Sequence, residues 1–273
     1  REKDKDLVKR YGEMKWVGLI HDGITENSFT LYAQEIMPIN ANKKSPRIEL
    51  LIRYIDKQGA VKLPENFLPA AERYTLASMI DRWVIKHFFA DKKLLSHIRT
   101  HPGMSVNINL SGLTLGEPDL TDYVSNLLKQ ANLPQKSLCF EITETAAVAN
   151  LAATSHFMRT LKLQGCEFAL DDFGIGVSSF AYLRNLPVDY LKIDGSFVRD
   201  VDTNSINAAM VAAINQVGHV MKIQTIAEFV ENESINKRLI AIGVDYAQGF
   251  YIHKPCALRE YLAPDQDKLV RHT

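Results

Sequence analysis

The sequence has few cysteines, no long apolar segment and no excess of charge of either sign. Its three cysteines, Cys139, Cys166 and Cys256, form no C-x-x-C pair and have no histidine at zinc-ligand spacing, which argues against a disulfide framework or a zinc knuckle. No apolar run approaches the roughly 18 residues of a membrane span. The 32 basic and 32 acidic side chains cancel, which excludes a chain-wide basic surface for DNA. Any charged function must therefore depend on local grouping.

The N-terminus begins Arg1-Glu-Lys-Asp-Lys-Asp, without an initiator methionine, and does not resemble a signal peptide. We expect a cytoplasmic piece of a longer protein, whose parent chain could carry a membrane anchor elsewhere. Apolar residues recur at helical spacing from Lys5 to His21. Residues 1–24 are therefore predicted to be a lead-in helix or linker from an upstream domain, and residues 25–273 the main domain.

Short apolar runs alternate along the chain with longer segments of helical periodicity. The runs span residues 29–36, 48–55, 104–110, 138–142, 167–170, 188–193, 222–227 and 246–251, and helical segments include 72–97, 120–131, 147–164 and 205–220. This alternation is typical of an α/β fold, and the number of runs favours a closed (β/α)8 barrel, or TIM barrel, over an open sheet. Only about a dozen turn-rich residues separate the first two runs, which predicts a modified barrel with an antiparallel first strand.

Successive predicted strands carry polar side chains at or near their carboxyl ends. These residues are Glu49, Asn109, Glu141, Asp171 with Asp172, Lys192, Glu228 and Gln248. The carboxyl ends of barrel strands meet at one rim, so these side chains are predicted to line one pocket. A single strand-end carboxylate is more often a helix cap or a satisfied polar contact. Repetition in strand after strand makes that interpretation weak here.

The predicted pocket is too acidic to exist without added cations. Five of its residues are carboxylates and only Lys192 is basic, and like charges in a partly desolvated site cannot all stay ionised alone. Two divalent cations together with Lys192 would balance the five carboxylates. The oxygen ligands favour Mg²⁺ or Mn²⁺, with Ca²⁺ expected to inhibit.

Two such ions suit a displacement at phosphorus, because they stabilise both the attacking and the leaving oxygen. They would also allow an acidic pocket to receive a phosphodiester. Arg53 follows Glu49 by four residues on the same strand face, which places it about 13 Å further along the strand. It could hold a phosphate at the mouth of the pocket, and a surface salt bridge is the alternative interpretation.

The ordered motifs resemble those of the EAL-domain cyclic-di-GMP phosphodiesterases over residues 29–255. They are E-L-L at 49–51 followed by Arg53, N-L-S at 109–111, E-I-T-E at 141–144, D-D-F-G at 171–174, K-I-D at 192–194, A-E-F-V-E at 227–231 and Q-G at 248–249. The resemblance implies a modified TIM barrel that opens cyclic di-GMP to linear pGpG with two Mg²⁺ or Mn²⁺ ions. It also implies a homodimer and a preceding sensory or GGDEF-type domain.

The resemblance further implies roles for individual residues. One ion is expected at Glu49, Asn109, Glu141 and Asp171, and the other at Asp171, Asp172 and Glu228. The expected catalytic residues are Lys192, which polarises the attacking water, Glu228, which is a candidate general base, and Glu49. Gln248 is expected to contact a metal through a water.

Substrate binding is expected from Arg53, Gln34 and Asp194. Glu144, Gly174 and Ser178 are expected to anchor the loop at residues 173–179, which in the family couples substrate binding to the dimer. All of these positions match the motifs of the family.

The chain departs from the family pattern without losing an expected ligand. Leu50 replaces the alanine of the naming motif, Glu35 stands where proline is common, Ile175 and Val177 alter the loop, and Phe229 replaces a glycine. These changes leave open a second hypothesis, a catalytically weak or inactive domain that binds cyclic di-GMP as a regulatory effector. A third, a barrel enzyme for sugar phosphates or enolates, is disfavoured by the adjacent Asp171 and Asp172.

Overall fold

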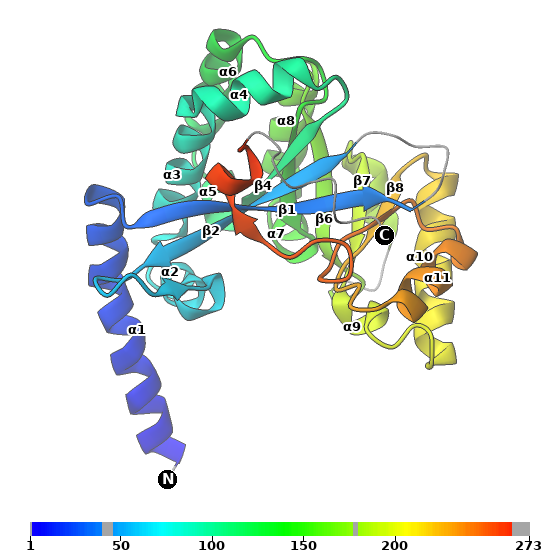
Figure 1. The fold of residues 1–273 in the computed structure, drawn as a ribbon, viewed down its shortest axis with the longest axis horizontal. Helices are drawn as coiled ribbons and strands as arrows, with labels where there is room; N and C mark the ends of the chain where they lie inside the picture. The colour runs from blue at the N-terminus through cyan, green and yellow to red at the C-terminus, as the bar shows by residue number, and fades with distance from the viewer. Residues whose placement is uncertain (1, 40–45, 177–179, 264–273) are drawn as a thin grey trace.

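The computed structural model describes residues 2–39, 46–176 and 180–263, with side chains from residue 12 onward. Its centre is a closed barrel surrounded by helices (Figure 1). The barrel strands are β1 (Phe29–Pro38), β2 (Arg47–Ile55), β4 (Ser105–Leu110), β5 (Leu138–Thr143), β6 (Glu167–Phe173), β7 (Tyr190–Ile193), β8 (Gln224–Ala227) and β9 (Tyr246–Ala247). Two short strands, β3 (Val61–Lys62) and β10 (Cys256–Ala257), pair with β2 and β1. The predicted α/β barrel is confirmed.

The first barrel strand runs against its neighbours, as predicted. β1 is antiparallel to β2, with Gln34 opposite Glu49. From β2 through β4 to β9 every neighbouring pair is parallel, and the barrel closes through the antiparallel pairing of β9 with β1. The carboxyl ends of the parallel strands therefore meet at one rim.

Helices cover the outside of the barrel. They are α1 (Glu2–Thr25), α2 (Leu68–Arg73), α3 (Ala77–Ala90), α4 (Lys92–Thr100), α5 (Gly112–Leu115), α6 (Leu120–Ala131), α7 (Glu144–Ala149), α8 (Leu151–Lys162), α9 (Gly195–Val198), α10 (Ser205–Val220), α11 (Glu233–Ile242) and α12 (Leu258–Tyr261), with short 3₁₀ segments at Pro64–Asn66 and Phe180–Asn185. The predicted helices at 120–131 and 205–220 match α6 and α10.

Several predicted boundaries are wrong for local reasons. The predicted helix at 72–97 is broken at Thr75, which has a φ of 58°, and again at Asp91, whose side chain accepts from the amides of Lys93 and Leu94 and starts α4. The predicted helix at 147–164 is interrupted at Asn150, which caps α8. The last predicted strand, 246–251, ends at Ala247.

Two apolar regions hold the barrel in place. The larger lies between the strands and the helices and includes Phe140, Phe157 and Phe168, whose rings contact one another. The smaller fills the barrel interior with Ile36, Cys139, Ala169, Tyr190, Ile226 and Tyr246. Because most of the interior cluster precedes the polar residues along the strands, the polar layer lies above a closed floor.

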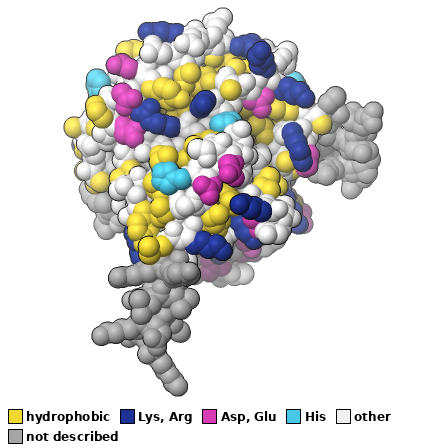
Figure 2. Space-filling view, turned by 90° about the vertical axis from the view of Figure 1, so that its left-hand side faces the viewer, with side chains coloured by type: hydrophobic (Ala, Val, Ile, Leu, Met, Phe, Trp, Pro, Cys, Tyr) yellow, Lys and Arg dark blue, Asp and Glu magenta, His cyan; other side chains and the backbone are white. Residues whose placement is uncertain are grey.

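The face of the molecule shown in Figure 2 carries charges of both signs and no single-sign cluster. Figure 2 shows acidic and basic side chains interspersed with apolar ones on the face that it presents. The N-terminal part of α1 projects away from the barrel (Figure 1), while its end is anchored by the fully buried Ile20. Within the described residues, no helix combines the length and the apolar character needed to cross a membrane.

Candidate metal and active site

Alternation along the strands directs a polar layer into the barrel. In β2, Glu49 and Arg53 are 5% and 6% exposed and share the inward face with Arg47, two and six residues beyond it. Leu50 points the other way into the outer core, so the departure from the naming motif does not touch the polar layer. The surface interpretation of Arg53 is therefore wrong, because its side chain is buried.

Lys192 lies at the centre of the polar layer. Its Nζ is 2.5 Å from Glu141 Oε2, 2.9 Å from Glu228 Oε1, 3.3 Å from Asp171 Oδ1 and 3.6 Å from Glu49 Oε2. The lysine side chain is 1% exposed. Four carboxylates, three from β2, β5 and β6 and one directly after β8, thus converge on one buried cation.

The electrostatics of the cluster follow from this shortage of positive charge. Burial, followed by repulsion from Glu49, raises the pKa of Glu141 to about 8. Burial also raises the pKa of Glu228 well above its ordinary value, with Asp171 adding to the shift. Burial alone would lower the pKa of Lys192, but the surrounding carboxylates outweigh it and raise that pKa. The cluster therefore favours additional bound cations.

Amide side chains hold Glu49 on the other side of the cluster. Asn109 Nδ2 donates to Glu49 Oε1 at 2.5 Å, and Gln248 Nε2 donates to Glu49 Oε2 at 2.6 Å. Gln248 also donates to Gln34 Oε1 at 3.1 Å, and Gln34 donates to the carbonyl of His253 at 3.0 Å. Glu49 is thus fixed from two strands, and Gln34 lies beside Gln248.

Asp171 and Asp172 reach the same site because β6 is irregular at this point. The pairing of β6 with β7 shifts register between Leu170 and Phe173, and Asp172 has a φ of 53°. A bulge of this kind breaks strand alternation, so two consecutive side chains can face one site. Oxygens of Asp171, Asp172 and Glu228 lie within 4.8 Å of one another.

The residues fit divalent metal ions on two observations. The clustered oxygens of Asp171, Asp172 and Glu228 are hard ligands of the kind that Mg²⁺ and Mn²⁺ prefer. In addition, Gln248 Oε1 is buried and has no hydrogen-bond partner among the described residues. A buried acceptor without a donor is expected to contact an ordered water. The position of Gln248 Oε1 beside Glu49 is consistent with a metal ion bound there together with a water.

The remaining predicted residues lie around the rim. Arg53 donates to the carbonyl of Ile52 at 2.9 Å and stacks near the Tyr32 ring. Asp194 accepts from Ser196 N at 2.7 Å and caps α9. Asp194 also contributes to raising the pKa of Asp172, after burial and Asp171, which shows that it lies near the site.

The loop after β6 is tied to α7 through Glu144. Glu144 is 2% exposed and accepts from Gly174 N at 3.1 Å and from Tyr182 Oη at 2.7 Å. Gly174 has a φ of 108°, and a Cβ there would meet the Phe197 ring at 2.8 Å. Ser178, also expected in this loop, and the altered Val177 lie outside the described residues.

Three sequence departures are placed by the structure. Phe229 follows Glu228 with a φ of 52°, and Arg199 lies over its ring at 4.4 Å. Ile175 is exposed. Glu35 lies outside the carboxylate cluster, and its amide donates to His253 Nδ1 at 3.5 Å.

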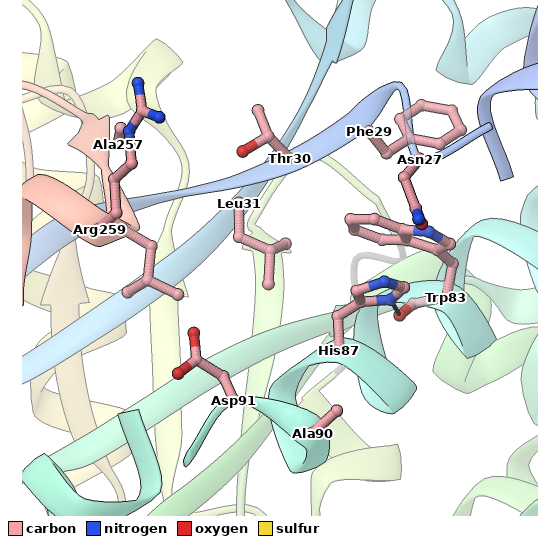
Figure 3. A pocket seen from close by; sticks show the side chains of 11 residues that line it. Asn27, Phe29, Thr30, Leu31, Trp83, His87, Ala90, Asp91, Ala257 and Arg259 are labelled. Carbon is pink, nitrogen blue, oxygen red and sulfur yellow. Dashed lines mark hydrogen bonds between the residues drawn. The ribbon is translucent and has the colours of Figure 1, made fainter. Parts of the chain in front are cut away.

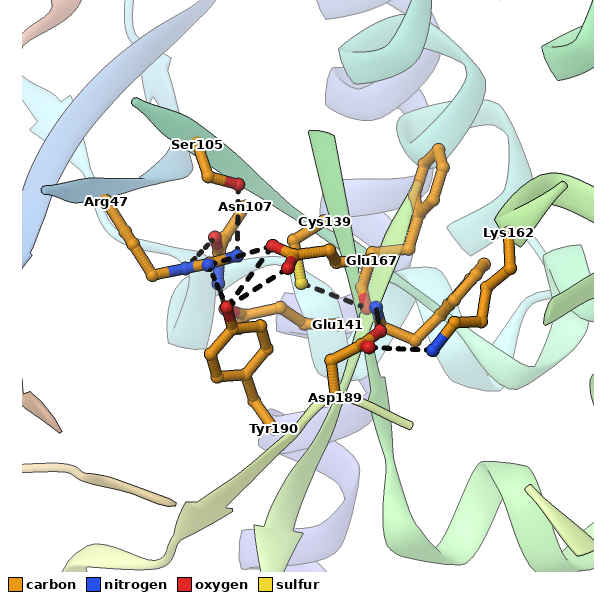
Figure 4. A network of polar contacts seen from close by, with 11 residues as sticks. Arg47, Ser105, Asn107, Cys139, Glu141, Lys162, Glu167, Asp189 and Tyr190 are labelled. Atoms are coloured by element: carbon orange, nitrogen blue, oxygen red, sulfur yellow. Dashed lines mark hydrogen bonds and ion pairs between the residues drawn. The ribbon is translucent and has the colours of Figure 1, made fainter. Parts of the chain in front are cut away.

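A second polar group below the cluster was not predicted from the sequence. It consists of Arg47, Ser105, Asn107, Glu167 and Tyr190, all buried (Figure 4). Arg47 stands two residues before Glu49, on the same strand face, and Asn107 two before Asn109. That spacing was the available signal, but it does not reveal partners that lie 120 residues apart, such as Arg47 and Glu167.

A cavity of about 460 Å³ lies outside the barrel, between the start of β1 and the helices α3 and α12. Phe29, Leu31 and Trp83 line it, and His87 stacks on Trp83 (Figure 3). The described residues that line the cavity include none of the carboxylates around Lys192, so the candidate site is not there.

Comparisons with known proteins identify relatives along most of the chain. The model of the EAL domain family matches residues 20–255. The cyclic di-GMP phosphodiesterase PdeB of Shewanella oneidensis is 40% identical over 271 residues, covering 99% of this chain and 31% of that protein. The cyclic di-GMP phosphodiesterase PdeF of Escherichia coli is 35% identical over 246 residues, covering 89% of this chain and 32% of that protein. The chain spans about a third of the length of these relatives.

Solved structures agree with this relationship. The crystal structure of the FimX EAL domain from Pseudomonas aeruginosa bound to c-di-GMP superposes with a TM-score of 0.80 at 30% identity, covering 92% of this chain and 98% of that one. The PaMucR phosphodiesterase in complex with c-di-GMP gives a TM-score of 0.83 at 29% identity, covering 90% and 99%. From the family match, the relatives and the fold, we conclude that this chain belongs to the EAL domain family.

Proposed function

We propose that this domain is a metal-dependent phosphodiesterase that hydrolyses cyclic di-GMP to linear pGpG. The observation that carries the proposal is the convergence of four carboxylates on Lys192 at the carboxyl ends of the barrel strands. Relatives at 35–40% identity are named cyclic di-GMP phosphodiesterases, and the choice of cyclic di-GMP as the proposed substrate rests on these names.

The acidic residues are proposed to hold two Mg²⁺ or Mn²⁺ ions. Glu49, Asn109, Glu141 and Asp171 would hold one, and Asp171, Asp172 and Glu228 the other. When bound, the ions would supply the positive charge that activates a water and stabilises the oxygens around phosphorus. Ca²⁺ is proposed to inhibit, because it favours a larger and more flexible ligand shell.

The chain's own residues would then orient water and move protons during hydrolysis of one phosphodiester bond. A water oxygen forms a bond to phosphorus, and the bond from phosphorus to the ribose 3′ oxygen breaks. Lys192 Nζ, already fixed by Glu141 and Glu228, would donate to the attacking water and orient it. Glu228 Oε1 would accept the proton that the water loses. A proton from solvent completes the 3′ hydroxyl, leaving a 5′ phosphate on pGpG.

Residues at the rim would place the nucleotide. Arg53, buried on the inward face beyond Glu49, would contact a phosphate, with Gln34 and Asp194 beside the cluster as further contacts. Glu144 and Gly174 would hold the loop after β6 close to the two aspartates. Ser178 is proposed in the same loop on its motif alone.

A chromatographic assay tests the proposal directly. The purified chain is incubated with cyclic di-GMP and Mn²⁺, with and without EDTA, and intact nucleotide and pGpG are quantified. We expect pGpG only in the metal-containing reaction. Calorimetric binding with the nucleotide recovered intact, at high protein concentration and with Mn²⁺ present, would contradict the enzyme and would assign a cyclic-di-GMP effector instead.

We also propose that the domain acts as a homodimer behind a sensory or GGDEF-type domain. The support is the exposure of Ile175 and Phe180 next to the loop after β6 and the greater length of the relatives. Light scattering after size exclusion should give twice the chain mass. A single-chain mass with nucleotide and metal present would contradict the dimer.

A further inference from the structure

A continuous chain of buried hydrogen bonds runs from the floor of the barrel to a proposed metal ligand (Figure 4). Arg47 Nε donates to Asn107 Oδ1 at 3.2 Å, and Asn107 Nδ2 donates to Glu141 Oε1 at 2.5 Å. Glu141 Oε2 in turn accepts from Lys192 Nζ at 2.5 Å. Both oxygens of Glu141 on β5 are therefore held by donors, one from the adjacent strand β4 and one from β7 across the barrel interior.

The donor chemistry of arginine fixes the direction of this chain. A guanidinium can only donate hydrogen bonds, so the group of Asn107 that faces it must be the amide oxygen. The amide nitrogen of Asn107 must then face Glu141, which offers an acceptor as a carboxylate. Arg47 thereby determines which end of the amide reaches Glu141, although Arg47 itself makes no hydrogen bond to Glu141.

Arg47 is itself locked from several sides. Its Nη1 donates to Glu167 Oε2 at 2.9 Å and to Tyr190 Oη at 2.6 Å, and its Nη2 donates to Ser105 Oγ at 3.0 Å. The guanidinium also lies 4.0 Å from the centre of the Tyr190 ring. The side chain of Arg47 is 2% exposed, against 9% for Glu167. A guanidinium with this many fixed partners cannot turn to present another group to Asn107.

We propose that Arg47 and Asn107 are positioning residues for the metal site, with Arg47 acting through Asn107 to hold Glu141 in a metal-binding orientation. The inference rests on the proposed function for the presence of the metal. Partners that orient a ligand in this way commonly change metal affinity by about 10–100-fold when they are removed. Asn107 is fully buried and lies two residues before the proposed ligand Asn109 on the same strand. Replacing Asn107 should therefore change the structure only close to the proposed metal site.

The test is calorimetric titration of the folded chain with Mn²⁺ alone, without nucleotide, at one fixed pH. Asn107→Leu has nearly the shape of asparagine but cannot donate to Glu141, and we expect its Mn²⁺ affinity to fall by about 10–100-fold. Ser105→Ala is the matched control, because Ser105 lies on the same strand and contacts Arg47 but not Glu141. Its affinity should stay within about twofold of the unmodified chain.

A double-variant cycle separates positioning from general stability. The double variant Arg47→Met with Glu167→Gln removes the Arg47 guanidinium together with the charge of its partner, so no unpaired charge stays buried. This double variant alone should weaken Mn²⁺ binding by roughly tenfold. Added to Asn107→Leu it should cause no further loss, because Arg47 acts through Asn107. Urea unfolding of every variant checks that affinity does not simply follow stability.

The outcomes distinguish the two proposals. Unchanged Mn²⁺ affinity in Asn107→Leu, an equal loss in Ser105→Ala, or additive losses in the cycle would overturn the positioning role while leaving the proposed function intact. If Asn107→Leu does not fold, unchanged affinity in the paired Arg47 and Glu167 variant overturns it. If the unmodified chain binds no Mn²⁺, both proposals fail.

Discussion

Replacement of Lys192 by methionine removes the only Lys, Arg or His nitrogen that, among the described residues, lies within 4 Å of the carboxylate cluster. Methionine keeps the apolar length of the side chain but carries no charge. Four carboxylates that lie 2.5–3.6 Å from Nζ then face one another in a buried site. Removing one partner of a buried ion pair costs about 3–5 kcal/mol. We therefore expect Lys192→Met to lose about that much free energy of unfolding at pH 8 without metal.

The stability loss of Lys192→Met should depend on pH. Burial and repulsion from Glu49 raise the pKa of Glu141 to about 8, and burial raises the pKa of Glu228. At pH 5 Glu141 is therefore protonated in the folded chain, so Lys192 has fewer negative partners to lose, and the raised pKa of Glu228 acts in the same direction. The stability difference between Lys192→Met and the unmodified chain should be smaller at pH 5 than at pH 8. Added Mn²⁺ should also reduce it at pH 8, because the ions replace the missing charge.

Urea unfolding followed by circular dichroism in EDTA measures these differences. Lys162→Met is the control, because Lys162 pairs with Asp189 at 2.7 Å but its side chain is 32% exposed. A partly exposed pair of this kind contributes at most about 1 kcal/mol, and the loss should change little between pH 5 and pH 8. Equal losses for the two lysine variants at pH 8, or no loss for Lys192→Met, would refute the role of Lys192 as the central counter-charge.

Three further predictions concern the ligands, the substrate and the metal-free state. Glu49→Gln keeps the side-chain shape but removes a charge shared by Lys192 and the proposed metal, and initial rates of pGpG formation should fall by more than about 100-fold; a rate within tenfold of the unmodified chain would contradict its role. Arg53→Ala should raise KM for cyclic di-GMP by roughly tenfold or more and leave Mn²⁺ affinity by calorimetry unchanged, and an unchanged KM would argue against a phosphate contact. In EDTA, the free energy of unfolding of the unmodified chain should fall as pH rises from 4.5 to about 8. The reason is that the pKa of Glu141 is raised in the folded chain from 4.5 to about 8. Urea midpoints that rise across this pH range would contradict the predicted fall in stability.

The sequence was sufficient to predict the barrel and the convergence of its polar strand ends. Lys192 and the carboxylates stand at or near the carboxyl ends of predicted strands, and eight strand signals implied a barrel rim where those ends meet. The structure accordingly brings Glu49, Glu141, Asp171 and Glu228 to Lys192. The short segment between the first two strands likewise predicted the antiparallel hairpin.

Other features depend on contacts that no local pattern encodes. The break in register that turns both Asp171 and Asp172 toward the site arises from the pairing of β6 with β7. The ion pair between Arg47 and Glu167 joins strands 120 residues apart. The start of α4 depends on Asp91 acting as the N-cap. Periodicity alone does not decide which of several polar residues caps a helix.

The central claim is that two divalent ions in the cluster around Lys192 support hydrolysis of cyclic di-GMP. The most direct measurement is the initial rate of pGpG formation as a function of free Mn²⁺ concentration, buffered from far below saturation upward. If both ions are required, the rate should be zero in EDTA and rise with a slope near two on logarithmic axes at low Mn²⁺, as expected for two-metal catalysis. Full activity in EDTA, or no pGpG at any Mn²⁺ concentration, would contradict the account.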